Sequence, residues 1–215
     1  MEGGAGAECE GGAARGEDVV AFIIYCLPRS RSAWMAHFLN YPLAVPTQPV
    51  GHNVAPLCKS VEGFIRAYKE EGMWGSVELE GMIGWQVIRK ELPDLKTVVV
   101  RRPLQESYNS LVMLGYKPNL TELANLNAML DIIASQPEVF SINASDLDAP
   151  VTCKWLFEHC LELEFDFEWW YQVSQLNIQV NIEGWKVIEA ETSARTALYH
   201  EDVLRRMEEI KSCLN

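Results

Sequence analysis

The stretch VVAFIIYCLPRSRSAW at residues 19–34 decides the fold expected for this chain. Its first half, residues 19–26, is a continuous apolar run rich in β-branched residues, which is typical of a central strand buried on both faces of a sheet. Pro28 ends this strand, and Ser30 or Ser32 then caps a helix. The stretch therefore predicts a strand, a loop with two arginines and a helix.

The rest of the chain repeats the alternation of strand and helix. Further buried strands are expected at residues 82–88 and 97–101, and a short strand at residues 139–142. Before these strands, residues 40–56 hold four prolines and are expected to form a loop, and residues 74–80 are expected to be irregular.

Helices are expected at residues 60–71, 103–114, 120–135, 151–161, 166–176 and 200–214. Strands that alternate with helices indicate a parallel sheet with helices on both faces. We therefore expect an α/β fold, a three-layer domain of the P-loop type. Its central sheet is mostly parallel, with four to five strands.

Length and charge limit the classes of function. The chain has 215 residues, which suits one domain, expected at residues 19–215 after a disordered Gly- and Ala-rich tail at residues 1–18. The formal net charge of −12 argues against a nucleic-acid partner, because such binding needs clustered Lys and Arg to neutralise phosphates. A small anion can still be held by a few local arginines and a helix N-terminus.

The cysteines and the apolar runs predict a cytoplasmic protein without a metal site. None of the six cysteines lies in a C-x-x-C pair, so their spacing predicts no zinc site. The sequence shows neither a secretory signal nor an apolar run long enough to span a membrane. We expect reduced thiols, no membrane partner and no bound metal.

Two arginine-rich segments are expected at one edge of the sheet. Residues 27–34 follow the first strand and residues 101–110 follow a later one, and in parallel α/β sheets ligands bind beyond the carboxyl ends of the strands. The helix after the first segment presents backbone N–H groups, and Arg29 and Arg31 add guanidinium groups that can grip a phosphate. The first segment lacks the glycines and the lysine of a Walker A loop.

The first segment resembles the 5′-phosphosulfate loop of the sulfotransferase family, roughly P-[KR]-[ST]-G-[ST]-T-x, often followed by Trp. The matching residues are Pro28, Arg29, Ser30, Ser32 and Trp34. In that family the loop holds the 5′-phosphate of 3′-phosphoadenosine 5′-phosphosulfate (PAPS), the basic residue at the position of Arg29 stabilises the bridging oxygen, and the Trp can stack on adenine. This chain departs from the family at Arg31, which replaces a glycine.

The second segment, TVVVRRPLQESYNSL at residues 97–111, resembles the family's 3′-phosphate motif, in which an Arg ends a strand and a Ser follows eight residues later. Arg102 and Ser110 have that spacing, and Arg101 with Asn109 is the other possible register. We favour the first pair because it supplies a hydroxyl group. The resemblance extends over residues 20–175, with specific residues in the two motifs only.

The resemblance also implies a general base after the first helix. His52 is our candidate, in a segment where some relatives have His-Glu and this chain has Asn53, which cannot accept a proton. His37 is expected to pack against the sheet, and Glu62 to be a solvated helix residue.

The resemblance implies a sulfotransferase that moves a sulfuryl group from PAPS to a hydroxyl or amine of a small-molecule or carbohydrate acceptor. The catalytic residues would be Arg29 and His52. PAPS would be held by Arg29, Ser30, Arg31, Ser32, Ala33, Trp34, Arg102 and Ser110. Two alternatives remain open: a P-loop-like small-molecule kinase, and a catalytically inactive nucleotide-binding or interaction protein on the same fold. The acceptor and the oligomeric state have no signature in the sequence.

Overall fold

A computed structural model of the chain describes residues 21–42, 50–178, 198–206, 208–209 and 212. The tail expected at residues 1–18 lies outside these ranges. None of the described helices combines the length and the apolar composition that crossing a bilayer requires.

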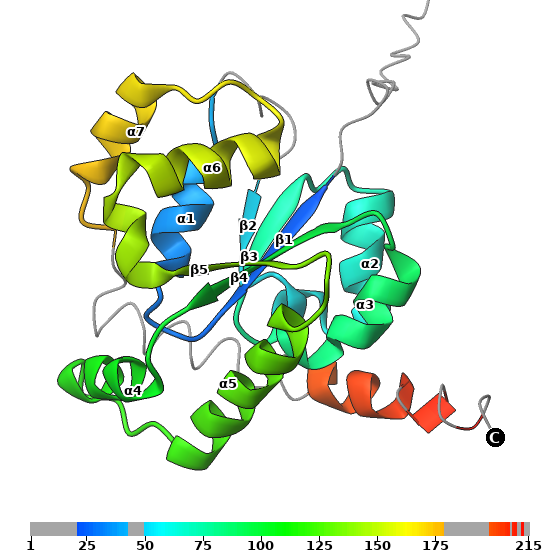
Figure 1. The fold of residues 1–215 in the computed structure, drawn as a ribbon. Coiled ribbons are helices and arrows are strands. Elements are labelled where there is room, and N and C mark those ends of the chain that lie inside the picture. Colours follow the sequence, from blue (N-terminus) through cyan, green and yellow to red (C-terminus); the bar gives the residue numbers. More distant parts are fainter. Residues whose placement is uncertain (1–20, 43–49, 179–197, 207, 210–211, 213–215) are drawn as a thin grey trace, which may run out of the picture.

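Among the described residues, five strands form one sheet in the order β2-β3-β1-β4-β5, and every neighbouring pair is parallel (Figure 1). The strands are β1 (Phe22–Cys26), β2 (Val50–His52), β3 (Gly75–Glu78), β4 (Lys96–Arg101) and β5 (Phe140–Asn143). This sheet confirms the predicted α/β class. The central position of β1 brings its carboxyl end beside those of β3 and β4.

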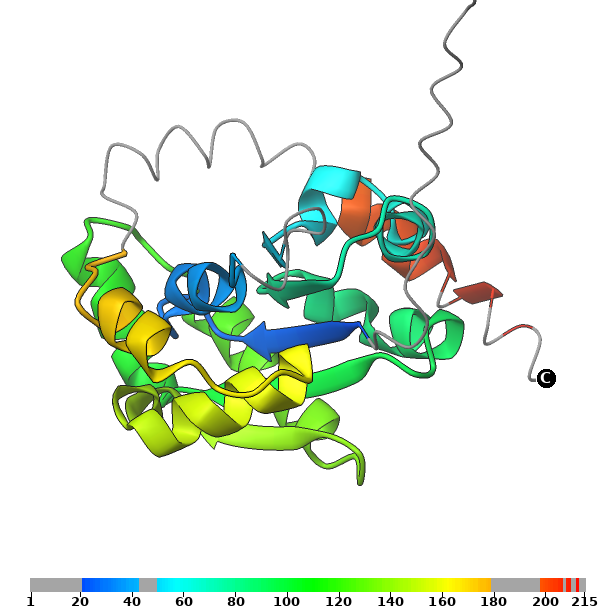
Figure 2. The ribbon, with the colours of Figure 1, turned by 90° about the horizontal axis from the view of Figure 1, so that it is seen from above.

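Helices cover both faces of the sheet, which gives three layers (Figures 1 and 2). The α-helices are α1 (Ser32–Leu39), α2 (Val61–Lys69), α3 (Trp85–Glu91), α4 (Leu104–Met113), α5 (Leu120–Ala134), α6 (Pro150–Leu161) and α7 (Phe167–Ser174). Short 3₁₀ turns are η1 (Ala55–Cys58), η2 (Gly81–Gly84) and η3 (Ala144–Asp148). A C-terminal helix is described for residues 198–206.

Strand β1 divides the core because its side chains alternate between the faces. Ile24 and its neighbours of the same parity face a cluster built from α1, α6 and α7. Ile23 and Tyr25 face a second cluster built from α2, α3, α5 and the C-terminal helix. All five residues of β1 are buried, as the apolar run predicts for a central strand.

The apolar run at residues 82–88 is not the strand that we expected. It forms the end of η2 and most of α3 instead. Its buried residues are Met82, Gly84, Val87 and Ile88, which recur at the spacing of a helix face. A short apolar run cannot be assigned to strand or helix by its composition alone, and here the helical period decides.

Two strands lie where the sequence predicts none. Strand β2 falls within the proline-rich segment 40–56 and β3 within the irregular segment 74–80. Strand β3 carries Ser76 and Glu78, both fully buried, so it lacks the apolar signature of a central strand. The Tyr68 hydroxyl lies 2.8 Å from the Ser76 hydroxyl and donates to the carbonyl of Phe22, which satisfies the buried serine.

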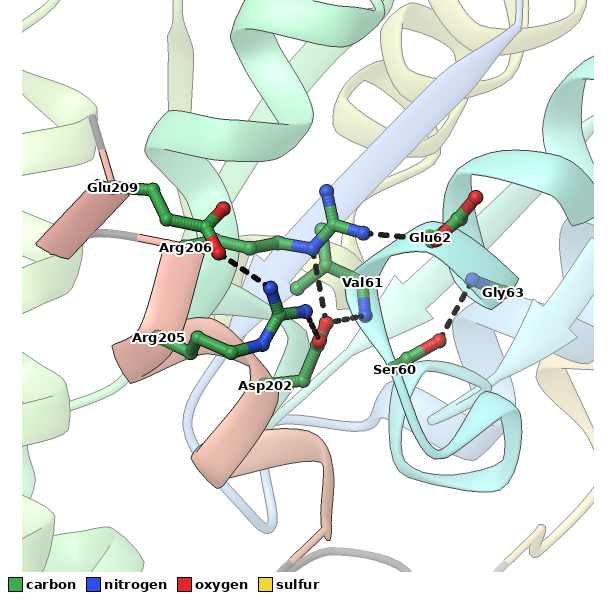
Figure 3. Close-up of polar contacts among 8 residues, drawn as sticks. All are labelled: Ser60, Val61, Glu62, Gly63, Asp202, Arg205, Arg206 and Glu209. Atoms are coloured by element: carbon green, nitrogen blue, oxygen red, sulfur yellow. Dashed lines mark hydrogen bonds and ion pairs between the residues drawn. The ribbon is translucent and has the colours of Figure 1, made fainter. Parts of the chain in front are cut away.

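The C-terminal helix is fastened to the first turn of α2 (Figure 3). The Asp202 carboxylate accepts a hydrogen bond of 2.8 Å from the N–H of Val61 and pairs with Arg205 and Arg206. The Ser60 hydroxyl caps the same helix by accepting from the N–H of Gly63 at 3.0 Å, as Ser at a helix start predicts. Two of the open N–H groups of α2 are therefore satisfied, one from 141 residues away.

The substitution Asp202→Ala removes the carboxylate that bonds α2. We expect a loss of about 1–2 kcal/mol in the free energy of unfolding, measured by urea denaturation, since the N–H of Val61 loses its partner. Glu209→Ala is the control, because the Glu209 side chain pairs with the exposed Arg205 and its removal should change stability by less than about 0.5 kcal/mol. Equal losses in the two variants would refute the capping role.

Candidate functional site

The loop between β1 and α1 has an unusual backbone. Arg29 and Arg31 adopt left-handed conformations, with φ of 69° and 64°. Arg31 occupies the N-cap position of α1 without a side-chain cap, so the prediction that Ser30 or Ser32 caps the helix is wrong. A left-handed residue followed by a helical one turns successive N–H groups toward the same side, which forms a concave binding surface for an anion.

Helix α4 and the residues before it hold this loop in place. The Ser107 hydroxyl donates to the carbonyl of Pro28 at 2.5 Å, and the Arg102 guanidinium donates to the carbonyl of Arg29. The Arg29 Nε atom in turn donates to the Ser110 hydroxyl at 3.1 Å, across 81 residues of sequence. The two arginine-rich segments of the sequence are therefore joined directly.

A cavity of about 510 Å³ opens where the two segments meet. The predicted site residues in its wall are Arg29, Arg31, Ser32, Ala33, Trp34, His52, Arg102 and Ser110. The other lining residues are Pro28, Leu79, Met113, Leu114, Leu176, Asn177 and Ile178. Sequence reasoning missed the apolar part of this wall, because isolated apolar residues at helix ends carry no functional signal.

Three predicted or alternative residues lie outside the cavity wall. Ser30 is fully buried, and its hydroxyl has no hydrogen-bond partner within the described part of the chain. Arg101 forms an ion pair with Asp131, and the Asn109 side chain accepts a hydrogen bond from Gln105. Of the two registers, only Arg102 with Ser110 faces the cavity.

The guanidinium groups of Arg29 and Arg102 lie close enough to repel each other. The pKa of Arg29 is lowered, first by burial and then by the charge of Arg102. An anion placed between the two groups would relieve this repulsion and restore the electrostatic balance.

Arg31 is held at the cavity edge by two contacts. Its Nη1 atom lies 2.6 Å from the carboxylate of Asp148, and its Cζ atom lies 4.4 Å from the ring centroid of Trp34. The Trp34 ring also stacks on Phe38 at 5.1 Å, and its indole N–H donates to the carbonyl of Val173 at 3.1 Å. Trp34 is thus a buried part of the cavity wall, held in its present orientation by these contacts.

His52 lies at the carboxyl end of β2, on the other side of the loop. Its Nε2 atom is 3.0 Å from the Ser32 hydroxyl, so the candidate base contacts the first residue of α1. His52 keeps an exposed surface, and partial desolvation of its ring lowers its pKa from 6.5, which favours the neutral imidazole. A neutral imidazole is the form that can accept a proton.

The residues after His52 are locked to the end of β3. The Asn53 side-chain oxygen accepts from the N–H groups of Leu79 and Glu80, at 3.2 and 3.4 Å. Glu78 is fully buried, and its two carboxyl oxygens accept from the N–H groups of Val54 and Ala55, at 2.8 and 3.1 Å. Asn53 and Glu78 therefore act together to fix the loop that carries His52.

The other two base candidates lie away from the cavity. His37 is exposed on α1, with its ring centroid 5.9 Å from that of Trp169, so the expectation that it packs against the sheet is wrong. Glu62 is an exposed residue of α2 that pairs with Arg206, as expected of a solvated helix residue.

Comparison with known proteins adds little. No family model matches the chain, and no curated protein matches it in sequence. Among solved structures, a gluconokinase from Sinorhizobium meliloti 1021 is similar, with a TM-score of 0.41 and 8% identity over 73% of this chain and 94% of that one. A likeness this low carries no functional argument.

The class of protein follows from the chain's own geometry. A wholly parallel sheet in the order β2-β3-β1-β4-β5, with helices on both faces and a strand–loop–helix unit at its central strand, defines an α/β domain of the P-loop type.

The buried carboxyl of Glu78 predicts a pH-dependent stability. Burial raises its pKa from the ordinary 4.5 to about 8. Between these two values the folded protein holds a proton that the unfolded chain has released, so the free energy of unfolding falls as the pH rises. The slope contributed by one group is at most about 1.4 kcal/mol per pH unit.

Glu78→Gln tests this prediction by urea denaturation across the same pH range. Its amide nitrogen faces one of the two N–H groups, so we expect lower stability at every pH but a flatter dependence on pH. An unchanged slope would show that another group titrates.

Proposed function

We propose that the cavity binds a nucleotide with two separate phosphate groups, and that the protein is a sulfotransferase that uses PAPS. The observation that carries this proposal is the meeting of two arginine-containing segments in the wall of one cavity, where Arg29 bonds Ser110 from 81 residues away. One phosphate would lie against the β1–α1 loop and the other against α4.

The loop supplies the donors for the 5′-phosphate. The first N–H groups of α1 have no carbonyl partner within the helix, and the helix dipole favours an anion there. The hydroxyl of Ser32 and the guanidinium of Arg31 line the same part of the cavity. Arg31 would exchange its contact with exposed Asp148 for the phosphate at little loss, since exposed ion pairs contribute little.

Arg102 and Ser110 supply the donors for the 3′-phosphate. Both residues line the cavity, and both already contact Arg29. Arg102 donates to the carbonyl of Arg29, and the Ser110 hydroxyl accepts from the Arg29 side chain. Arg29 therefore lies between the two phosphate positions. From there its guanidinium can neutralise negative charge that develops on the oxygen leaving the sulfur atom.

Bound PAPS would supply an electrophilic sulfuryl group, and the residues of the chain would position and neutralise it. His52 would take the proton of the acceptor hydroxyl or amine as the new bond to sulfur forms and the bond to the 5′-phosphate breaks. The half-buried side chains of Leu114 and Ile178 would shield part of the same cavity from water.

A small-molecule kinase is the second candidate, and the observation that favours it is the carboxyl of Glu80. This group follows cavity-lining Leu79, its pKa is raised by burial, and its Oε2 atom has no hydrogen-bond partner in the described part of the chain. Carboxylate oxygens are the ligands that Mg²⁺ of a Mg·ATP substrate prefers.

Thermal denaturation with three ligands separates these functions, because a ligand that binds the folded state raises the melting temperature. We expect stabilisation by adenosine 3′,5′-bisphosphate and a much smaller effect of 5′-AMP or Mg·ATP. Stabilisation by Mg·ATP alone would favour the kinase. Binding of the bisphosphate without transfer from PAPS to any acceptor in a broad panel would indicate an inactive binding protein.

Substitution of the cavity arginines tests the site directly. Arg29→Ala and Arg102→Ala should each weaken binding of adenosine 3′,5′-bisphosphate by about 10- to 100-fold, the range for a lost charge-assisted hydrogen bond. Arg101→Ala is the matched control, since Arg101 pairs with Asp131 outside the cavity, and its affinity should stay within about twofold. Calorimetric titration measures all three, and a larger loss in the Arg101 variant would reverse the assigned register.

A further inference from the structure

The hydrogen bond between Ser32 and His52 links the phosphate loop to the candidate base. The Oγ and Nε2 atoms lie 3.0 Å apart, and both residues line the cavity. Ser32 is the first residue of α1, so its hydroxyl lies at the helix end where an anion binds. The same hydroxyl group therefore serves two possible partners, the imidazole and a bound phosphate.

Counting protons shows that these two contacts are coupled. A hydroxyl group has one proton to donate, and a neutral imidazole has one N–H and one lone pair. Either Ser32 donates to Nε2 while the imidazole proton sits on Nδ1, or Nε2 carries the proton and donates to Ser32. In the second arrangement the serine proton is free to point elsewhere, and Nδ1 holds the lone pair.

A fully ionised phosphate monoester accepts hydrogen bonds and donates none. Ser32 can satisfy a phosphate at the start of α1 only by donating to it, which excludes donation to His52. The contact between the two residues survives only if Nε2 becomes the donor.

We propose that phosphate binding at the start of α1 selects the Nε2–H tautomer of His52, and thereby makes Nδ1 the basic nitrogen. The imidazole proton moves from Nδ1 to Nε2 by exchange with solvent, so the number of bound protons is unchanged. The hydrogen bond to Ser32 is made through Nε2, which leaves Nδ1 as the nitrogen that would take the proton of an acceptor.

The surroundings of His52 favour a tautomer change over simple protonation. Partial desolvation lowers the pKa of the imidazole, which disfavours the doubly protonated form. Asn53 and Glu78 fix the backbone next to His52. The ring can therefore stay in place while its proton moves from Nδ1 to Nε2.

The inference rests on the proposed nucleotide site and adds an order of events to it. The nucleotide binds first and prepares Nδ1, and the acceptor then meets a base whose lone pair is free. An acceptor that arrives before the nucleotide meets an imidazole whose tautomer is not selected.

Long-range ¹H–¹⁵N spectra of the full chain with ¹⁵N-labelled histidine test the proposal at pH 7.5. The spectra are recorded alone, with adenosine 3′,5′-bisphosphate and with inorganic phosphate, and His52→Gln identifies the His52 signals. In the bound protein we expect a protonated-type shift at Nε2 and an unprotonated-type shift at Nδ1. Exposed His37, which lies on α1 with Ser32, is the internal control and should keep its tautomer.

The Ser32→Ala variant separates tautomer selection from binding alone. It should still bind the bisphosphate, more weakly, and its His52 signals should not move toward the Nε2–H form. A bound state with the Nδ1–H tautomer, or with both nitrogens protonated, overturns the inference and leaves the nucleotide site intact. A switch with inorganic phosphate but no response to the bisphosphate overturns the proposed function instead, and no response to either ligand overturns both.

Discussion

The candidate site depends on the hydrogen bonds by which the segment after β4 holds the carbonyl groups of the β1–α1 loop. Ser107 and Arg102 bond the carbonyls of Pro28 and Arg29, residues more than 70 positions earlier in the chain. Left-handed backbone at a residue other than glycine costs of order 1 kcal/mol, and the loop contains two such residues. These bonds offset that strain, and they also bring two guanidinium groups together.

The sheet order explains why distant parts of the sequence meet in this way. Because β1 lies between β3 and β4, the loops that follow these strands emerge side by side at one edge. Helix α4 approaches the β1–α1 loop from the β4 side, and the end of β2 brings His52 from the other side. The same arrangement places a candidate base and two arginine-containing segments around one cavity.

The sequence predicts those parts of the molecule whose residues have one strong role. The runs that form β1 and β4 are apolar and β-branched, and both were recognisable as buried strands. Strand β3 was not predicted, because its buried residues Ser76 and Glu78 are polar. Their hydrogen-bond partners lie elsewhere in the chain, and no local pattern records them. Likewise, arginines beside a strand end indicated the cavity, whereas the apolar wall at Met113 has no signal before the fold brings it there. The cap at Arg31 could not be foreseen either, because no local pattern of residues records a left-handed backbone at an arginine.

A crystal structure of the protein with adenosine 3′,5′-bisphosphate would test the central claim most directly. Our account predicts the 5′-phosphate against Ser32 and Ala33, the 3′-phosphate against Arg102 and Ser110, and Arg29 between the two groups. A nucleotide that is bound elsewhere, or that places both phosphates on one side of Arg29, would contradict it.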